Sequence, residues 1–202
     1  MKKMFICLIG LLTLAASPAH ADEALQYFNL GMKSTITSKK IRYFTRALEL
    51  NPNLAGAYEK RGFLYYIQEK YDKVIQDFQT YLKVAPPKTE AYLMLGLGYL
   101  KSGIYGNAIQ NFSHAIEMDP TRTAPYANRA EAYRLLGYYD NAIRDSTRAI
   151  QLGKDPRSEA DAYRTRARAF RKLGRGDEAA ADTIPPIGQI LASGTIPNAE
   201  RP

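Results

Sequence analysis

The sequence has few of the side chains that most often carry enzyme chemistry. Its 202 residues include one cysteine, two histidines and no tryptophan. Cys7 lies in an N-terminal segment that we expect to be removed, so the remaining chain can form no disulfide and no thiolate metal site. His114 is then the one histidine left, which excludes a metal site built from several histidine and cysteine ligands.

Other catalytic groups are equally sparse. A dyad of His114 with a serine has Ser113 or Ser146 as its partner, and neither serine lies in a supporting motif. Gly96 and Gly98 lie within a helical pattern rather than after a strand, so they do not indicate a dinucleotide-binding loop. We interpret His114 as an ordinary surface position and expect no enzyme, no metal and no cofactor.

Only one long apolar run occurs, and it lies at the N-terminus. Lys2 and Lys3 precede the run from Met4 to Ala16, which is too short for a membrane span of about 20 residues. The small residues of Ala19-His20-Ala21 follow it. This three-part pattern is typical of a secretory signal peptide, so we expect residues 1–21 to be cleaved off. The alternative is an uncleaved N-terminal anchor.

The expected signal peptide also predicts a location. A short signal with two lysines points to a bacterium, so we expect a periplasmic or secreted protein. No second apolar run of spanning length follows, and we expect no membrane span after cleavage. Loss of the two lysines lowers the formal net charge from +8 to +6, which is basic but not extreme.

A sequence unit recurs along the rest of the chain. Its clearest copy runs from Thr89 to Pro120 and contains two amphipathic helical patterns joined by a turn at Gly103. The first aromatic residue of this unit returns at a constant interval, at Tyr58, Tyr92 and Tyr126, and then after a slightly longer interval at Tyr163. The additional residues of the longer interval fall in the connection 153–158. Such a period indicates an array of repeats.

Equivalent positions carry similar residues in each copy. The middle of the first helix has a small residue, Gly62, Gly96, Ala130 or Ala167. Glycine inside a helix costs about 1 kcal/mol relative to alanine, so we expect close packing there, between the second helix of one copy and the first helix of the next. The turn between the two helices carries Gly103, Gly137 and Gly174, with Glu69 in the earlier copy.

The unit resembles the tetratricopeptide repeat. The residues that carry the resemblance are Tyr92, Leu95, Gly96, Tyr99, Gly103, Tyr105, Ala108, Phe112, Ala115 and Pro120. The resemblance implies an all-α fold, a right-handed superhelical solenoid of antiparallel helix pairs with about four to five repeats. The solenoid is expected over residues 22–192, with repeats at 22–54, 55–88, 89–122, 123–156 and a partial one at 160–186. We expect residues 193–202 to be a mobile tail.

The resemblance also implies that the first helix of each pair lines a concave groove. Outside the packing stripe these helices carry Glu59, Phe63, Tyr66 and Ile67, then Leu93, Leu97, Leu100 and Lys101, then Ala127, Glu131, Arg134 and Leu135, and finally Arg164, Arg168, Arg171 and Lys172. The predicted partner-binding residues are Phe63, Tyr66, Leu93, Leu97, Leu100, Arg134, Arg164, Arg168 and Arg171. The groove is thus expected to be apolar in its middle and basic towards its C-terminal end.

Two alternatives stay open for these positions. In one, Leu93 and Leu97 simply fill a narrow interior. In the other, the basic last helix is a solvated cap, although seven cations gather there, at Arg157, Arg164, Arg166, Arg168, Arg171, Lys172 and Arg175. The family's carboxylate clamp of lysine and asparagine is absent, because its positions hold Glu59, Phe63, Leu93 and Leu97.

The sequence therefore predicts a non-enzymatic adaptor or scaffold of the bacterial cell envelope. A peptide or helix of another protein would lie in the groove, with an acidic portion near the arginines. The alternatives are an anionic envelope polymer bound by the basic last repeat, and self-assembly through the solenoid ends. Nucleic acid is not expected, because the basic residues are not interleaved with exposed stacking aromatics. The oligomeric state is left open.

Overall fold

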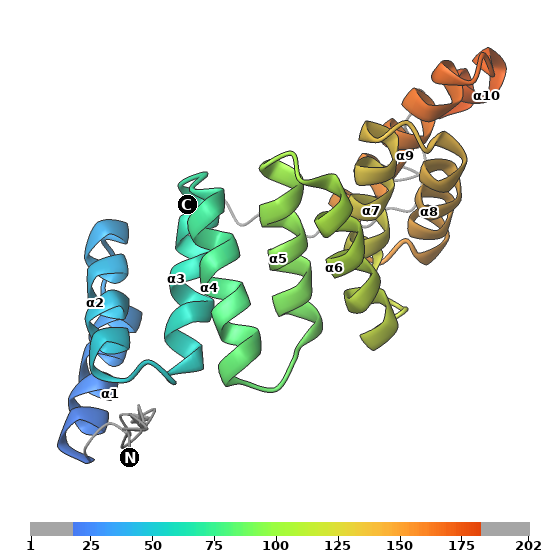
Figure 1. The fold of residues 1–202 in the computed structure, drawn as a ribbon. Coiled ribbons are helices and arrows are strands. Elements are labelled where there is room, and N and C mark those ends of the chain that lie inside the picture. Colours follow the sequence, from blue (N-terminus) through green and yellow to red (C-terminus); the bar gives the residue numbers. More distant parts are fainter. Residues whose placement is uncertain (1–17, 183–202) are drawn as a thin grey trace, which may run out of the picture. The chain divides into compact units, whose positions relative to one another are not determined.

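A computed structural model describes residues 18–182 of the chain (Figure 1). This part contains ten α-helices and no strand, which confirms the predicted all-α fold class. The helices are α1 (Pro18–Lys33), α2 (Thr37–Leu50), α3 (Ala55–Ile67), α4 (Tyr71–Val84), α5 (Thr89–Lys101), α6 (Tyr105–Met118), α7 (Thr123–Leu135), α8 (Tyr139–Leu152), α9 (Pro156–Lys172) and α10 (Gly176–Ala181).

Some expectations concern residues outside the described range. The apolar run of the expected signal peptide precedes Pro18, and the residues around the expected cleavage point, Ala19 to Ala21, lie in the first turns of α1. The end of the last repeat and the expected tail 193–202 follow Asp182, the last described residue.

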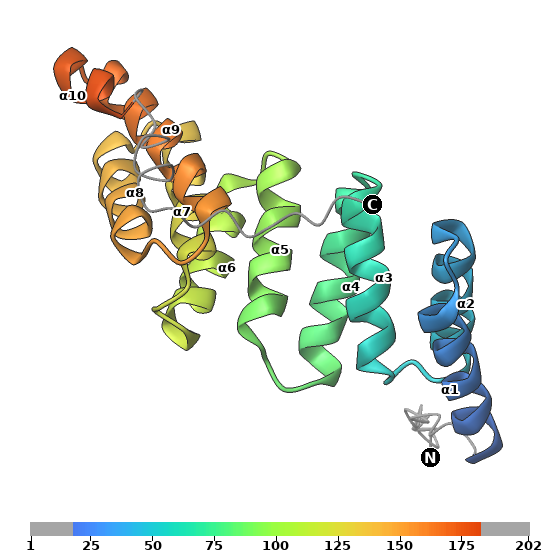
Figure 2. The same cartoon turned by 180° about the vertical axis from the view of Figure 1, so that it is seen from behind.

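Consecutive helices pack as antiparallel pairs. α1 packs on α2, α5 on α6, α7 on α8 and α9 on α10. Successive pairs also pack on one another through α4 and α5, α6 and α7, and α8 and α9, and α7 contacts both α5 and α9. Figures 1 and 2 show the pairs from α5 to α9 side by side. A solenoid of helix pairs, as the repeated unit predicts, is confirmed.

The chain divides between Ala57 and Tyr58 into two compact units. The first unit contains α1, α2 and the start of α3. The second unit contains the rest of α3 and the helices from α4 to α10.

In the second unit, a phenylalanine of one helix packs where its partner helix has a glycine. A Cβ atom on Gly62 would lie 2.8 Å from the ring of Phe78, and one on Gly96 would lie 2.6 Å from the ring of Phe112. Both rings are almost completely buried and have no room to move aside. Close packing at these glycines is therefore confirmed, but the partner is a ring of the same helix pair rather than a helix of the next pair.

The pair α7–α8 fills the same place with different residues. Ala130 and Ser146 occupy the positions that Gly96 and Phe112 hold in the preceding repeat. Ser146 is 0% exposed, and its hydroxyl has no hydrogen-bond partner in the described part of the chain. A buried hydroxyl without a partner costs free energy, because it has given up its hydrogen bonds to water.

In the four pairs from α3–α4 to α9–α10, the turn contains one residue in the left-handed region. Gly103, Gly137 and Gly174 have φ angles of 77°, 84° and 74°, and Glu69 occupies the same place with a φ of 57°. The turn position expected from the sequence is therefore correct in these four pairs. At Glu69 the Cβ atom costs about 1 kcal/mol, which the three glycines avoid.

Replacement of the unpartnered hydroxyl tests this description of the core. We expect Ser146→Ala to raise the free energy of unfolding by about 1 kcal/mol, because the desolvation cost of the hydroxyl disappears. Urea titration followed by circular dichroism measures the change. Ser113→Ala is the matched control, because the Ser113 Oγ donates to the Ile109 carbonyl and accepts from Arg129, at 2.8 Å each. A loss of stability in Ser146→Ala as large as in Ser113→Ala would contradict the prediction.

Candidate interaction surface

The predicted binding residues lie on α3, α5, α7 and α9, the first helices of the pairs in the second unit. Three positions recur on each of these helices. We call them together the helix-A surface, which consists of Phe63, Tyr66 and Ile67, then Leu97, Leu100 and Lys101, then Glu131, Arg134 and Leu135, and then Arg168, Arg171 and Lys172.

The part of this surface on α3 is apolar and exposed. Phe63 is 52% exposed and Ile67 is 59% exposed, and because they are one helical turn apart they lie on the same face of the helix. Tyr66 is half-buried, and its ring contacts Tyr71 with the ring centroids 6.0 Å apart. Burial and Tyr71 raise the pKa of Tyr66, whereas Arg157 acts in the opposite direction. Arg157 of α9 is therefore within electrostatic reach of α3.

The part on α5 is largely closed. Leu93 and Leu100 are 6% and 8% exposed and belong to a hydrophobic cluster with Phe112 of α6 and Ala132 of α7. Leu97 is half-buried and packs against the same cluster. Leu93 therefore agrees with the alternative in which these leucines fill the interior, and Leu100 is buried with it. The reason is that α7 packs on α5 and covers its remaining apolar face.

On α7 the predicted cation is already paired. Arg134 donates to both carboxylate oxygens of Glu131, through Nε at 2.7 Å and Nη2 at 2.6 Å. This hydrogen bonding raises the pKa of Arg134. Glu131 also accepts a hydrogen bond of 3.2 Å from the Thr165 hydroxyl of α9. Arg134 thus belongs to a hydrogen-bond network that joins α7 and α9. Because Glu131 neutralises its charge, Arg134 is poorly suited to bind an acidic partner.

The cations on α9 differ from Arg134. Arg164, Arg168 and Arg171 are all exposed. Arg164 forms an ion pair with Asp161, whereas the other two make no ion pair with any described residue. Lys172 is likewise exposed and without an ion pair in this range. The helix-A surface therefore ends in three positive charges that no residue within 18–182 compensates by an ion pair.

One repeated feature was not foreseen from the sequence. Arginine and aspartate side chains form ion pairs at one constant sequence spacing in three helix pairs, Arg61–Asp77, Arg129–Asp145 and Arg166–Asp182. In each, the guanidinium donates two hydrogen bonds of 2.6 to 3.0 Å to the two carboxylate oxygens. We call these pairs the arginine staples.

Each staple lies beside aromatic rings, and those of Arg129 and Arg166 also link neighbouring repeats. The Arg129 guanidinium lies 5.8 Å from the centroid of the Tyr126 ring and 5.9 Å from that of Tyr133. Its Nη1 donates a third hydrogen bond of 2.8 Å to the hydroxyl of Ser113, in the preceding repeat. Burial opposes the charge of Arg129, but the hydrogen bonds and attraction of Asp145 leave its pKa raised.

One arginine of the basic C-terminal helix, Arg166, belongs to a staple. Arg166 donates to Thr147 of α8 at 2.9 Å as well as to Asp182, so it belongs to the helix interface and not to the exposed cations. The repeat at α5–α6 lacks the staple, since Leu95 and Asn111 hold its two positions. A search for arginine and aspartate at this spacing, in step with the repeat, would have revealed the pairs.

No catalytic arrangement surrounds His114 among the described residues. Its ring is 55% exposed, lies 5.1 Å from the Tyr92 ring and approaches Glu117 to 3.2 Å. In the same part of the chain, no group of three or more histidine, cysteine, aspartate or glutamate side chains is placed to hold a metal ion. Within residues 18–182, no helix has both the length and the apolar character needed to cross a membrane.

Comparison with known proteins accounts for the repeated unit. Residues 89–122 and 124–155 match the tetratricopeptide repeat family. These two ranges, about a third of the chain, are therefore similar to tetratricopeptide repeats. The two matched ranges cover the pairs α5–α6 and α7–α8, which lie at the centre of the second unit. A search of curated proteins gave no match.

Several solved structures have the same fold. A crystal structure of MamA protein is 20% identical, with 90% of this chain and 99% of that chain covered and a TM-score of 0.76. A MamA fragment from Desulfovibrio magneticus RS-1 is 18% identical, with 86% and 98% covered and a TM-score of 0.75. YrrB, described as a TPR protein with an unusual peptide-binding site, is 17% identical, with 87% and 91% covered and a TM-score of 0.66. At such identities the likeness shows the fold alone.

The α5–α6 repeat, which has Leu95 and Asn111 in place of a staple, suggests substitutions that test the contribution of a staple to stability. We expect Arg129→Leu to lower the free energy of unfolding by about 3 kcal/mol, because Asp145, which is buried, loses its counter-ion. The double variant Arg129→Leu/Asp145→Asn should recover most of this loss, because Leu95 and Asn111 already occupy these positions in the α5–α6 pair. Urea titration measures both variants. If the double variant is less stable than the single one, the pair does not act as described.

Proposed function

We propose that the protein is a non-catalytic adaptor that binds a peptide or helix of a partner protein on its helix-A surface. The observation that carries the proposal is the pair of exposed apolar side chains, Phe63 and Ile67, on one face of α3. Both residues stay more than half exposed within the array of repeats. Apolar side chains one helical turn apart suit the anchors by which a groove or helix face holds an amphipathic partner.

The charged end of the helix-A surface supports an acidic portion in the partner. Arg168 and Arg171 on α9 carry charges that no described residue compensates. Arginine binds carboxylates with two parallel hydrogen bonds, so this helix suits aspartate and glutamate side chains.

The comparisons agree with a binding role. The matched ranges are tetratricopeptide repeats, and YrrB, which shares the fold, is described as having a peptide-binding site. We carry peptide binding over to this chain as a proposal on the evidence of its own exposed residues. Leu93 and Leu100 are left out of the proposed surface because they are buried.

A second candidate function is the binding of an anionic envelope polymer by α9. Arg168, Arg171 and Lys172 favour it, because all three are exposed and make no ion pair among the described residues. Such binding would weaken steeply as salt is added, since it depends on charge alone. Binding through Phe63 and Ile67 would change much less with salt.

Capture of partners from an envelope extract tests the adaptor function. We expect Phe63→Asp/Ile67→Asp to reduce the captured protein about tenfold or more, because two apolar anchors are lost. Quantitative mass spectrometry of the captured proteins is the measurement. Ile104→Asp is the matched control, since Ile104 is 45% exposed but lies in the turn before α6.

The variants also separate the two candidate functions. Equal loss in the double variant and in Ile104→Asp would contradict the helix-A surface. Capture that survives Phe63→Asp/Ile67→Asp but is lost in Arg168→Gln/Arg171→Gln, and at high salt, would favour the anionic polymer. All variants alter exposed side chains, and their thermal unfolding curves should match that of the unaltered chain.

We further propose that the protein is exported to the periplasm of a bacterium or secreted. The three-part pattern of residues 1–21 supports this location. When the full chain is produced in a Gram-negative host, intact-mass measurement of the periplasmic fraction should give a chain that begins at Asp22. Ala19→Arg should block processing, because the cleavage site requires a small residue there. Recovery of the chain from the cytoplasm with residues 1–21 attached would contradict export.

A further inference from the structure

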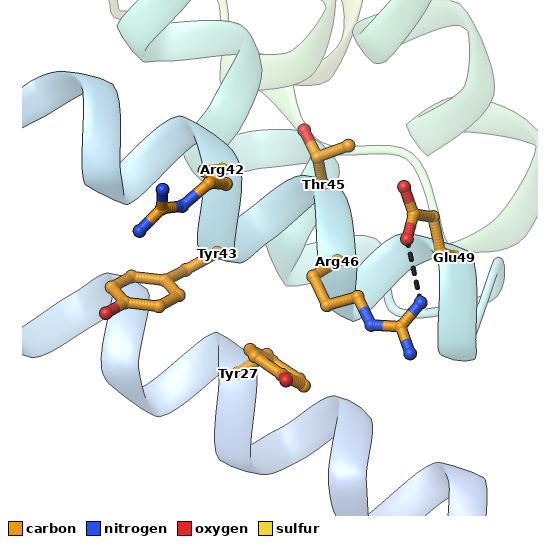
Figure 3. A pocket seen from close by; sticks show the side chains of 6 residues that line it. All are labelled: Tyr27, Arg42, Tyr43, Thr45, Arg46 and Glu49. Atoms are coloured by element: carbon orange, nitrogen blue, oxygen red, sulfur yellow. Dashed lines mark hydrogen bonds and ion pairs between the residues drawn. The ribbon is translucent and has the colours of Figure 1, made fainter.

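The first unit contains a pocket that plays no part in the proposed adaptor surface. It has a volume of about 480 Å³, within the range of about 300 to 1,000 Å³ typical of ligand sites. Figure 3 shows its lining, which consists of Tyr27 of α1 and Arg42, Tyr43, Thr45, Arg46 and Glu49 of α2. All of these residues belong to one helix pair.

Two tyrosine rings and two guanidinium groups define the pocket. The rings of Tyr27 and Tyr43 lie with their centroids 6.4 Å apart and their planes inclined at 34°. The Arg42 guanidinium lies 5.8 Å from the centroid of the Tyr43 ring, and that of Arg46 lies 5.9 Å from the Tyr27 ring. The aromatic faces thus hold both cations at the pocket.

The two arginines differ in their charge partners. Arg46 donates a hydrogen bond of 3.0 Å to Glu49, and the carboxylate of Glu23 acts on it as well. Arg42 is exposed and makes no ion pair with any residue in the described part of the chain. The pocket therefore contains Arg46, whose charge Glu49 compensates, and Arg42, which has no carboxylate partner among the described residues.

The other repeats show what occupies the equivalent place. Tyr27 and Tyr43 have the same sequence spacing as the two members of a staple, and they hold the positions that Arg61 and Asp77 hold in the next repeat. In that staple and the two later ones, a carboxylate lies against a guanidinium beside tyrosine rings. The first repeat has the rings and the guanidinium, but both staple positions are tyrosine. The one carboxylate in the lining, that of Glu49, already pairs with Arg46, so Arg42 has no carboxylate partner among the described residues.

The later staples also show that this place accepts a group from another helix. Arg129 and Arg166 each donate to a hydroxyl on the second helix of the preceding repeat, that of Ser113 or Thr147. The corresponding side of the first repeat therefore suits the approach of a polypeptide.

We propose that this pocket binds the carboxylate of an aspartate or glutamate side chain on a partner polypeptide. Arg42 forms the ion pair with that carboxylate, and the faces of Tyr27 and Tyr43 pack against the stem of the incoming side chain. The site lies in the first unit and uses no residue of the helix-A surface. It is thus a second contact point, separate from the proposed adaptor surface.

Binding of a fluorescein-labelled, capped peptide of eight glutamates to the full chain tests the proposal. Arg42→Gln should weaken binding about tenfold or more, because a charge-assisted hydrogen bond is lost. Lys39→Gln, an exposed position on the same helix that does not line the pocket, should weaken it less than about twofold. Both changes are made in chains with Arg168→Gln and Arg171→Gln, so that α9 contributes no binding.

Fluorescence anisotropy is the measurement, and three outcomes would overturn the proposal. The first is equal weakening by Arg42→Gln and Lys39→Gln, which indicates general attraction to basic residues. The second is equal binding of a peptide of eight glutamines, and the third is complete displacement by millimolar inorganic phosphate. Phe63→Asp/Ile67→Asp should leave the glutamate peptide bound, so failure of this site and failure of the adaptor surface are distinguishable.

Discussion

A partly buried guanidinium that lies beside tyrosine rings and pairs with a buried aspartate sets how the helices of the second unit meet. Arg129 joins Asp145 of its own repeat to Ser113 of the preceding one, so one side chain fixes both the pairing within a repeat and the joint between repeats. Removing ions from water costs several kcal/mol each, and the attraction between them offsets this cost only with good geometry. A misplaced neighbouring helix would leave the cost uncompensated, so the staple disfavours other packings of these similar helices.

The sequence predicted the features that depend on local pattern and missed those that depend on distant neighbours. The helix pairs and the turn at Gly103 follow from periodicity and from a backbone position that favours glycine, both visible within one repeat. The burial of Leu93 and Leu100 is decided by α7, which no pattern within α5 reveals. Likewise, Arg166 resembles a surface cation until its partner, Asp182, is brought to it by the packing of α10 on α9.

The helix-A surface is discontinuous. Exposed apolar side chains occur on α3 and uncompensated arginines on α9, whereas the leucines of α5 between them are taken up by packing. A partner that uses both ends makes two small contacts rather than one large one. Two linked contacts bind much more tightly than either alone, provided that the segment between them spans the distance. The spacing of apolar and acidic residues in a partner therefore matters as much as their identity.

The joint between α4 and α5 lacks a staple, because Leu95 occupies the place of the arginine. Gly98 packs there against Val74 and Ile75, and Gln79 donates a hydrogen bond of 2.8 Å to the Tyr99 hydroxyl, so apolar contact and a neutral hydrogen bond take the place of the staple. Apolar contacts weaken on cooling, whereas ion pairs are lost when acid protonates their carboxylates. In a linear array each joint contributes separately to stability. Cold therefore weakens mainly the interface between α4 and α5, whereas acid weakens mainly the interfaces that contain a staple. Which interface is weakest depends on the conditions as well as on the sequence.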